Sequence, residues 1–395
     1  MLNTLKSFDL KGKRVLIRVD FNVPLKNGQV TDDFRIRAAL PTIQHCLNTG
    51  ASVVLMSHLG RPKGKVIDEL SLMPVGETLA DLLEKSIKFS HDCVSEDARD
   101  VSLGLSPGEV HLLENLRFHE EETSNDANFS ALLSKHGSIF INDAFGTAHR
   151  AHASNVGVST HFSQRGVGYL VEKEVKFLSE VIKRPKRPLV VLLGGAKVDS
   201  KLSLINRFLG EADTIMIGGG MAFTFLAAMG KQIGGSLVDK TMVRTAQKII
   251  QTAKEQKINL HFPSDVICAK SLSEPEGRSE ISVDDIPADR MGLDIGSATI
   301  REFSEIIEKA GTIIWNGPMG VFETAGFEEG THSIAQAIAD ATRTGTISVV
   351  GGGDSASAVK NYGLMESMSH VSTGGGASLE LLSGISLPAL TVLER

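Results

Sequence analysis

Four loops in the first half of the chain carry arginine beside other polar groups, and each loop follows an apolar run. They span residues 18–24, 57–62, 114–119 and 142–152, and Arg35 stands near a helix start just beyond the first of them. Arginine forms paired hydrogen bonds with carboxylate and phosphate groups. If the loops meet at one edge of a sheet, their arginines predict a pocket for a small, multiply charged anion. The arginines in question are Arg35, Arg61, Arg117 and Arg150.

Each of these arginines on its own fits a second interpretation. A single loop arginine is as readily a solvated surface residue or the partner of a nearby carboxylate, and only their joint placement favours the anion pocket. The loop histidines His58, His149 and His152 are interpreted as hydrogen-bonded loop residues or substrate donors. No cysteine or carboxylate stands beside them at metal-ligand spacing, so we expect no structural metal.

In the second half of the chain, the loops after the apolar runs are rich in glycine instead of charged residues. Five apolar runs end in glycine, at 189–195, 215–220, 313–317, 347–353 and 370–376. Parallel strands place their carboxyl ends along one edge of a sheet, so these loops predict a rim of open N–H groups that suits a polyphosphate. Two of the runs lead into helix-compatible sequence, and the positive end of a helix dipole would add to the site.

Lys197 and Lys201 follow the first of these glycine turns, four residues apart, and would share one face of a helix. A lysine is a mobile point charge that can follow a phosphoryl group during transfer. The alternative, two exposed lysines in a first helical turn, is disfavoured because cations there oppose the helix dipole. Asp354, directly after three glycines, is a candidate Mg²⁺ ligand on nucleotide phosphates and also a candidate helix N-cap, and both roles are compatible at one position.

The elements that must position these loops alternate between strand and helix. Apolar runs predict buried parallel strands at 14–19, 52–56, 110–113 and 138–141, with helices at 35–48, 75–85 and 128–136 between them. This alternation predicts an α/β fold with two doubly wound, Rossmann-like parallel-sheet domains. The expected limits are 1–168 for an N-terminal domain, 169–183 for a hinge helix and 184–383 for a C-terminal domain.

Length and composition narrow the class of protein. A chain of 395 residues is long enough for two domains, and its formal net charge of −6 gives no general reason to bind nucleic acid or an anionic membrane. Its three cysteines are far apart, and no apolar run approaches the ~18 residues that span a bilayer. We expect a cytoplasmic protein, and a monomer because no hydrophobic surface stripe is evident.

Taken together, the loops resemble those of the phosphoglycerate kinase family, of bacterial length. The family's motifs occur here in the family's order and cover nearly the whole chain: RVDFNVP (18–24), SHLGRP (57–62), ENLRFHEEE (114–122), NDAFGTAHRAHAS (142–154), GGAKVDSK (194–201), GGGMAFTF (218–225), NGPMGVFE (316–323), GGGDS (351–355) and HVSTGGGASLELL (370–382). The resemblance implies reversible phosphoryl transfer between Mg·ATP and the carboxylate of 3-phosphoglycerate, which gives 1,3-bisphosphoglycerate and ADP.

The resemblance also implies roles for single residues. Those implied to bind 3-phosphoglycerate in the N-terminal domain are Asp20, Phe21, Asn22, Arg35, His58, Leu59, Gly60, Arg61, Arg117 and Arg150. Those implied to bind the nucleotide are Lys201, Gly219, Glu323, Gly352, Gly353, Asp354 and Ser355, with Mg²⁺ held through Asp354. Those implied to act on the transferred group are Arg35, Lys197, Lys201, Gly374 and Gly375. The tail, 384–395, is implied to pack back on the N-terminal domain.

Phosphoryl transfer of this kind is catalysed by positioning and electrostatic stabilisation, and a carboxylate acceptor needs no general base because it is ionised at neutral pH. We expect a cleft between the domains that closes around the reactants and excludes water. One alternative is a catalytically silent protein that binds phosphorylated ligands, although every charged group of the transfer site is present. Another is a nicotinamide-dependent dehydrogenase, although neither half has the G-x-G-x-x-G fingerprint after its first strand; a Walker A loop is also missing.

Overall fold

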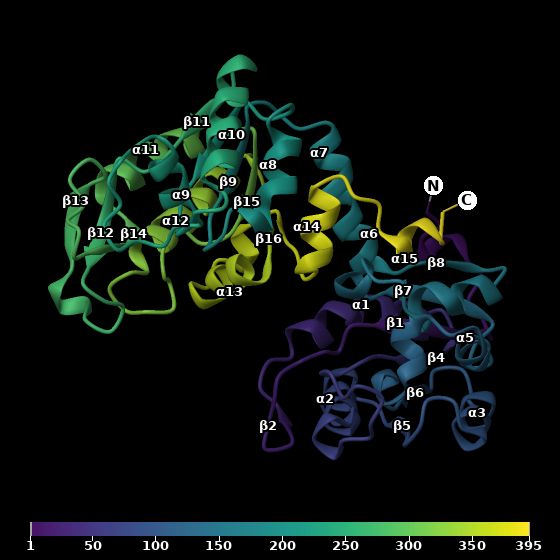
Figure 1. The fold of residues 1–395 in the computed structure, drawn as a ribbon. Helices are drawn as coiled ribbons and strands as arrows, with labels where there is room; N and C mark the ends of the chain where they lie inside the picture. The colour runs from purple at the N-terminus through teal and green to yellow at the C-terminus, as the bar shows by residue number, and fades with distance from the viewer. Residues whose placement is uncertain (1, 395) are drawn as a thin grey trace. The chain divides into compact units, whose positions relative to one another are not determined.

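The structure is a computed structural model that describes residues 2–394. The chain forms two compact units: the first runs to Lys176 and includes the C-terminal segment from Ile385, and the second is Phe177–Gly384. Each unit contains its own six-stranded parallel sheet (Figure 1). The predicted α/β fold with two parallel-sheet domains is therefore confirmed, while the finer domain limits given above stay predictions.

The sheet of the first unit has the strand order β5-β6-β4-β1-β7-β8, and all neighbouring strands run parallel. Its strands are β1 (Arg14–Val19), β4 (Ser52–Met56), β5 (Ile87–Ser90), β6 (Val110–Leu113), β7 (Ile139–Asp143) and β8 (Arg165–Val167). The four predicted strands are the central ones, β1, β4, β6 and β7. Apolar runs indicated them because a central parallel strand is buried on both faces.

Helices and a small hairpin complete the first unit. The helices are α1 (Phe34–Asn48), α2 (Met73–Leu83), α3 (Glu96–Leu103), α4 (Glu120–Ser124), α5 (Ala127–Ser134), α6 (Tyr169–Val175) and α15 (Pro388–Thr391), and the hairpin strands are β2 (Leu25–Lys26) and β3 (Gln29–Val30). The predicted helices correspond to α1, α2 and α5, with ends within two residues of those expected. Helix α15, near the C-terminus, is joined to the rest of the first unit by the N–H of Ala389, which donates to the carbonyl of Ala148 at 3.2 Å.

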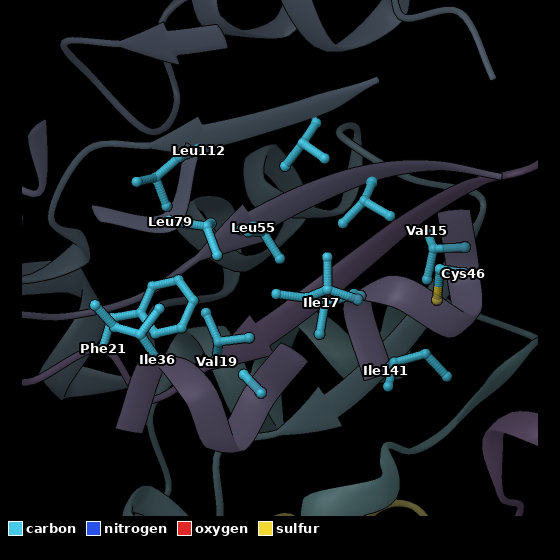
Figure 2. Packing of buried hydrophobic residues seen from close by; sticks show 14 of the residues in the cluster. Val15, Ile17, Val19, Phe21, Ile36, Cys46, Leu55, Leu79, Leu112 and Ile141 are labelled. Atoms are coloured by element: carbon cyan, nitrogen blue, oxygen red, sulfur yellow. The ribbon is translucent and has the colours of Figure 1, made fainter. Parts of the chain in front are cut away.

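Side chains alternate between the two faces of β1. Val15 and Ile17 point to one face, where they join a buried cluster with Ile36 of α1 and Leu79 of α2 (Figure 2). Arg18 follows Ile17 directly, so its side chain points to the opposite face of β1, where it is wholly buried. An arginine within a buried strand needs polar partners there, and those partners belong to the site described below.

The segment that the sequence predicts as one helix over 169–183 is helical, but in three stretches. Helix α6 passes into a π-helical turn, Lys176–Glu180, and then into the short helix α7, Val181–Lys183. The change between the two compact units along the chain falls at Lys176 and Phe177, inside the π-helical turn. Wide turns of this kind often mark functional positions in helices.

The main sheet of the second unit has the order β11-β10-β9-β15-β16-β17, again with all neighbours parallel. Its strands are β9 (Leu189–Leu193), β10 (Thr214–Ile217), β11 (Asn259–His261), β15 (Thr312–Asn316), β16 (Ile347–Gly351) and β17 (His370–Val371). All five glycine-ended runs of the sequence are strands of this one sheet. Their glycine loops therefore leave the sheet at the same edge, as predicted.

A second, antiparallel sheet with the order β13-β12-β14 belongs to the same unit and was not predicted. Its strands are β12 (Asp265–Ala269), β13 (Ser279–Ser282) and β14 (Met291–Ile295). The helices of this unit are α8 (Leu202–Phe208), α9 (Met221–Ala228), α10 (Val243–Glu255), α11 (Ser297–Glu308), α12 (Glu329–Arg343), α13 (Gly353–Asn361) and α14 (Gly376–Leu382). One buried cluster surrounds Trp315 of β15, and another joins α9 to the antiparallel sheet. Across the described residues, no helix has the length and apolar content that a membrane span needs.

Candidate active site

The carboxyl ends of β1, β4, β6 and β7 bring the predicted polar loops of the first unit to one edge of its sheet. Asp20 pairs with Arg35, with 3.0 Å between its Oδ2 and the guanidinium Nη1. The side-chain oxygen of Asn22 accepts the N–H of Gly60 at 2.9 Å, and the carbonyl of Gly60 accepts from Arg117 at 2.7 Å. Four of the predicted loops and helix starts are thus joined by direct hydrogen bonds.

Beside this network the first unit has a hollow of about 1180 Å³. Three of the predicted arginines line it, Arg61, Arg117 and Arg150, together with Lys63, His119 and His152. Glu120 is the one acidic side chain in the lining. The hollow is therefore strongly basic, and its arginine forks suit carboxylate and phosphate oxygens.

The positive charges around the hollow repel one another, as is expected of a site that binds an anion. Burial, Arg18 and Arg150 lower the pKa of Arg117 to about 10, and its buried Nε has no hydrogen-bond partner among the residues that the structure describes. Burial and the same arginines lower the pKa of His152 to about 4. An anion in the hollow would relieve both conflicts.

His58 is held as a neutral ring with a defined tautomer. Burial and then Arg18 lower its pKa well below the ordinary value. Nη2 of Arg18 lies 3.2 Å from Nδ1 of His58, and arginine can only donate, so Nδ1 accepts. The ring proton is then on Nε2, which makes His58 a hydrogen-bond donor to a ligand.

Two residues of the predicted acceptor site contribute no side chain to the polar edge. Phe21 and Leu59 are buried, and both belong to the hydrophobic core of the first unit. Their backbones are fixed instead: the N–H of Phe21 donates to Ser57 Oγ at 2.9 Å, and the N–H of Leu59 donates to Asn115 Oδ1 at 3.1 Å. These residues therefore shape the loops that carry the charges.

In the second unit the glycine loops after β9, β10 and β15 pack backbone against backbone. Gly195 N–H donates to the carbonyl of Pro318 at 2.9 Å, and Gly219 N–H donates to the carbonyl of Met319 at 3.0 Å. Gly219 has φ +64°, and a Cβ there would lie 2.6 Å from the nitrogen of Gly195. Glycine is required at this position by conformation and by space.

These loops form one wall of a second hollow, of about 940 Å³. Glycine backbone and apolar side chains make up most of its lining, including Phe223, Leu237, Leu293 and Val321. The carboxylates of Glu323 and Asp354 also line it. An apolar slot with a few polar groups at its margin suits a planar base with a polar sugar and phosphates.

Lys201 and Lys197 occupy different environments. Lys201 is half-buried, and its Nζ donates to Oδ1 of Asn316 at the end of β15. Burial lowers the pKa of Lys201, and the charge of Asp354 opposes that shift. Lys197 is exposed in the loop before a 3-10 turn, Asp199–Lys201, so the predicted helical face shared by the two lysines is wrong. The spacing predicted a continuous helix over both lysines, but α8 begins only at Leu202 and Lys201 is its N-cap.

The loop after β16 presents open backbone at the start of α13. Gly352 has φ +93° and is the N-cap, so Asp354 is the second helical residue and its interpretation as an N-cap is wrong. Gly353 is exposed, and a Cβ added there would meet nothing within 4 Å, so this turn is not covered by other residues on that side. The buried hydroxyl of Ser355 accepts the N–H of Gly317 at 2.6 Å and so ties this loop to the loop after β15.

The last glycine loop, after β17, contains Gly374 and Gly375. The N–H of Gly374 donates to Ser372 Oγ at 3.1 Å, and Gly375 has φ +51° directly before α14. A Cβ at Gly375 would meet nothing within 4 Å. Gly375 therefore lies on an open backbone turn at the same sheet edge as the other glycine loops, whereas Gly374 is buried and its N–H is bonded to Ser372.

Two sets of side chains bear on metal binding. The exposed carboxylate of Asp354 lines the second hollow beside the open glycine loop, and Mg²⁺ takes oxygen ligands of this kind together with phosphates. Among the described residues, Asp92, Cys93 and His119 also place ligand atoms within 4.8 Å of one another. Asp92 Oδ1 there accepts N–H groups of the following turn and lies 3.5 Å from His119 Nε2, and burial keeps the pKa of the Cys93 thiol high.

Sequence reasoning missed several side chains that shape the two hollows. Arg18, Glu122 and Ser154 form a buried polar group beneath the first hollow, and Asn316 receives Lys201 beside the second. Their signal in the sequence was weak, because Arg18 stands within an apolar strand and Glu122 within a run of three glutamates. Only the fold shows which of them are buried.

The fold and the two hollows define a class of protein: a two-domain α/β protein with an arginine-lined hollow at one parallel sheet and a glycine-rimmed, largely apolar hollow at the other. The phosphoglycerate kinase family profile matches residues 5–385. The phosphoglycerate kinase of Chloroherpeton thalassium is 49% identical over 392 residues, which cover 99% of each chain. That of a Picosynechococcus species is 49% identical over 387 residues, 98% of this chain and 96% of the other.

Solved structures agree with the sequence comparison. Phosphoglycerate kinase from Coxiella burnetii is similar with a TM-score of 0.90 and 39% identity, over 100% of this chain and 99% of the other. The enzyme from Pyrococcus horikoshii is similar with a TM-score of 0.85 and 33% identity, over 100% and 98%. The chain belongs to the phosphoglycerate kinase family.

Proposed function

We propose that this chain carries out the reaction of its family, the reversible transfer of a phosphoryl group between ATP and the carboxylate of 3-phosphoglycerate. The products are ADP and 1,3-bisphosphoglycerate, and the step belongs to glycolysis. The observation that carries the proposal is that one unit has an arginine-lined hollow and the other unit has a glycine-rimmed hollow, with Lys201 close enough to the lining residue Asp354 to interact with its charge. Family membership across nearly the whole chain supports it.

The first hollow would bind 3-phosphoglycerate. Arg61, Arg117 and Arg150 offer their guanidinium groups to its phosphate, in a lining where burial and mutual repulsion favour an anion. Asp20 and Asn22 would hold the hydroxyl and carboxyl end, with Arg35 and the donor Nε2 of neutral His58 beside them. Gly60 is hydrogen-bonded to both Asn22 and Arg117. Its loop therefore connects the residues proposed for the carboxyl end of the ligand with those proposed for its phosphate.

The second hollow would bind the nucleotide. Its apolar wall, which includes the loop of Gly219, would take the base, with Glu323 placed for the ribose and the loop of Gly352 and the uncovered Gly353 for the phosphates. Ser355 holds this loop in shape. Asp354 would hold Mg²⁺, which when bound supplies positive charge to the nucleotide phosphates.

The residues of this chain would act on the transferred group by charge and position alone. Lys201, steadied by Asn316, and the exposed Lys197 would lie near the phosphoryl oxygens, with Arg35 and the amides of Gly374 and Gly375. Fixed positive groups of this kind stabilise the charge of an in-line transfer. No group has to remove a proton, because the acceptor carboxylate is already ionised.

A coupled assay tests the function directly. The chain is supplied with Mg·ATP and 3-phosphoglycerate, and the 1,3-bisphosphoglycerate formed is reduced by a coupling enzyme while NADH loss is followed. Rapid turnover that depends on Mg²⁺ is the expected result. A folded sample that binds both ligands and shows no turnover would instead be the catalytically silent binding protein.

The proposal also includes the oligomeric state, the location, the partners and the domain closure of the protein. We propose a monomer, and a cytoplasmic location, which the three free buried cysteines support because thiols stay reduced there. The small-molecule substrates are its proposed partners, and no role for nucleic acid or a membrane is proposed. The closing of the two domains around the reactants stays a prediction from the chemistry of water exclusion.

A further inference from the structure

One carboxylate beneath the basic hollow has no part in the transfer chemistry proposed above. Glu122 is the third residue of α4, and its side chain is wholly buried, whereas Glu120 and Glu121 are exposed. A buried carboxylate is costly unless hydrogen bonds and an opposite charge compensate it. The partners of Glu122 therefore indicate why the fold keeps it.

Glu122 is bonded mainly to Ser154. Its Oε2 accepts the N–H of Ser154 at 2.9 Å, and its Oε1 accepts the Ser154 hydroxyl at 2.7 Å. That hydroxyl in turn accepts from Nε of Arg18 at 2.7 Å, and Nη2 of Arg18 lies 3.9 Å from Oε1. Glu122, Ser154 and Arg18 form a closed, buried triangle.

The triangle anchors the segment that carries two side chains of the hollow. The side chain of Asn155, next to Ser154, accepts the N–H of His152 and donates to the carbonyl of Arg150, each at 3.0 Å. Nδ1 of His152 lies 3.7 Å from Oε1 of Glu122. The backbone of Arg150 and His152 is thus fixed by Asn155, whose neighbour Ser154 is held by Glu122.

The triangle also sets the charge and direction of Arg18. Arg18 donates to His58, and it is one of the cations that lower the pKa of Arg117. Glu122 opposes that effect on Arg117, and it is the first charge that opposes the effect of burial on the pKa of Arg18. The carboxylate allows an arginine to stay buried beneath a basic hollow.

We propose that Glu122 is a positioning residue of the acceptor site, which rests on the proposed function of that site. It holds Arg18 and Ser154 in place. Through them it orients His58 from one side of the hollow and the segment with Arg150 and His152 from the other. Glu122 does not touch the substrate.

Charge and position predict opposite results when Glu122 is changed. As a charge alone, Glu122 makes the hollow less positive, so its removal would strengthen anion binding. As a positioning residue, its loss lets the basic groups move away from the places where they meet the anion, so anion binding would weaken. The sign of the change in affinity therefore decides between the two roles.

The test is calorimetric titration of the full chain with 3-phosphoglycerate. For Glu122→Gln, nearly the same size without the charge, we expect about tenfold weaker binding, which is about the effect of one lost hydrogen bond to a charged group. Mg·ADP affinity should stay at the wild-type value. In the coupled assay, the KM for 3-phosphoglycerate should rise while kcat changes little. Glu121→Gln, an exposed neighbour on the same helix, is the matched control and should behave like the wild type.

Ser154→Ala gives a second test that leaves every charge in place. It should also weaken 3-phosphoglycerate binding, because it cuts the triangle, and it decides the matter if Glu122→Gln does not fold. Unchanged or tighter binding in folded Glu122→Gln, or unchanged binding in Ser154→Ala, would overturn the positioning role. A wild-type chain that fails to bind 3-phosphoglycerate would overturn the proposed function instead, and inorganic phosphate, titrated in the same way, would still compare the variants.

Discussion

Lys201 is the side chain of the second unit that we propose to act most directly on the transferred group. It is half-buried, and its Nζ donates to Asn316. Burial works against its charge while Asp354 supports it, so an incoming phosphate would find a cation that is already partly desolvated. Such a group acts more strongly on a phosphoryl oxygen than a fully hydrated surface lysine does.

We therefore expect Lys201→Met to lower kcat by about a hundredfold to a thousandfold, the usual cost of a removed transition-state contact. The affinity for 3-phosphoglycerate should stay unchanged, because that ligand is assigned to the other unit. Steady-state kinetics and calorimetry measure the two quantities. The exposed Lys248 of α10 provides the control, Lys248→Met, which should leave both unchanged. A large loss of 3-phosphoglycerate binding in Lys201→Met would contradict this division of labour.

At the residue scale, the sequence predicted side chains by type but not by environment. The arginines were found because they stand in loops after apolar runs, and the hollow gathers Arg61, Arg117 and Arg150 as expected. Arg18 begins the first of these loops, but the sequence did not predict that it would be buried or which residues it would contact. Its burial and its partner Glu122 depend on contacts between residues more than a hundred positions apart in sequence. The roles of all these residues in binding stay predictions.

At the scale of elements, close backbone contacts between loops make single glycines necessary. Gly219 combines φ +64° with a Cβ position 2.6 Å from backbone, whereas Gly230 has φ +82° and open space around it. A residue other than glycine in this conformation costs about 1 to 3 kcal/mol. Gly230→Ala should show only that cost, and Gly219→Ala should show it together with the displacement of the loop after β9.

Gly219→Ala is thus expected to lower the free energy of unfolding more than Gly230→Ala does, and to weaken Mg·ADP binding, which Gly230→Ala should leave intact. Chemical denaturation and nucleotide titration measure the two effects. Equal losses of stability in both variants would mean that the contact between the loops has no energetic importance.

The elements themselves were predictable where packing left a strong pattern. Central strands such as β1, β4 and β9 are continuous apolar runs, because both of their faces are buried. The short antiparallel strand β13 alternates between half-buried and exposed residues and gave no such pattern. The helical face expected for Lys197 and Lys201 failed because spacing alone does not say where a helix begins. The cap of a helix depends on the turn before it.

A buried histidine pair gives the first unit a pH dependence. One hydroxyl, Ser102 Oγ, joins His136 Nδ1 at 2.7 Å and His111 Nδ1 at 2.9 Å. Burial lowers the pKa of both rings to about 4. Unfolded histidine has a pKa near 6.5. Between these values the folded chain binds fewer protons than the unfolded chain, so this contribution to stability is full above pH 6.5 and is lost as the pH falls towards 4.

We expect His136→Asn to reduce the slope of the unfolding free energy against pH between about pH 4 and 6.5. The reduction should be at most about 1.4 kcal/mol per pH unit, the slope that one proton contributes. Urea denaturation at several pH values measures the slope. The buried carboxyl of Asp143, whose pKa burial raises to about 7, acts with the opposite sign in this range, so slopes are compared between variants. The exposed His161 supplies the control, His161→Asn; an unchanged slope in His136→Asn would show that its ring is protonated in the folded chain.

At the scale of the whole molecule, each unit has a hydrophobic core of its own. The sequence indicated two domains because the β, α, β alternation occurs twice with different loop chemistry. Trp315, the single tryptophan of the chain, is wholly buried in the core of the second unit. Its fluorescence therefore reports the unfolding of the unit to which the nucleotide is assigned.

A ligand stabilises the unit that binds it, by about 2.7 kcal/mol when its concentration is about 100 times its Kd. Mg·ADP at that concentration should raise the denaturant midpoint followed by Trp315 fluorescence. 3-Phosphoglycerate should leave that midpoint unchanged, while it raises the midpoint of the remaining helical signal followed by circular dichroism. If 3-phosphoglycerate shifts the fluorescence midpoint as much as Mg·ADP does, then either the two units unfold as one or the glycerate binds in the second unit. Titration of Gly219→Ala with 3-phosphoglycerate separates these cases, because only binding in the second unit would be weakened by that change.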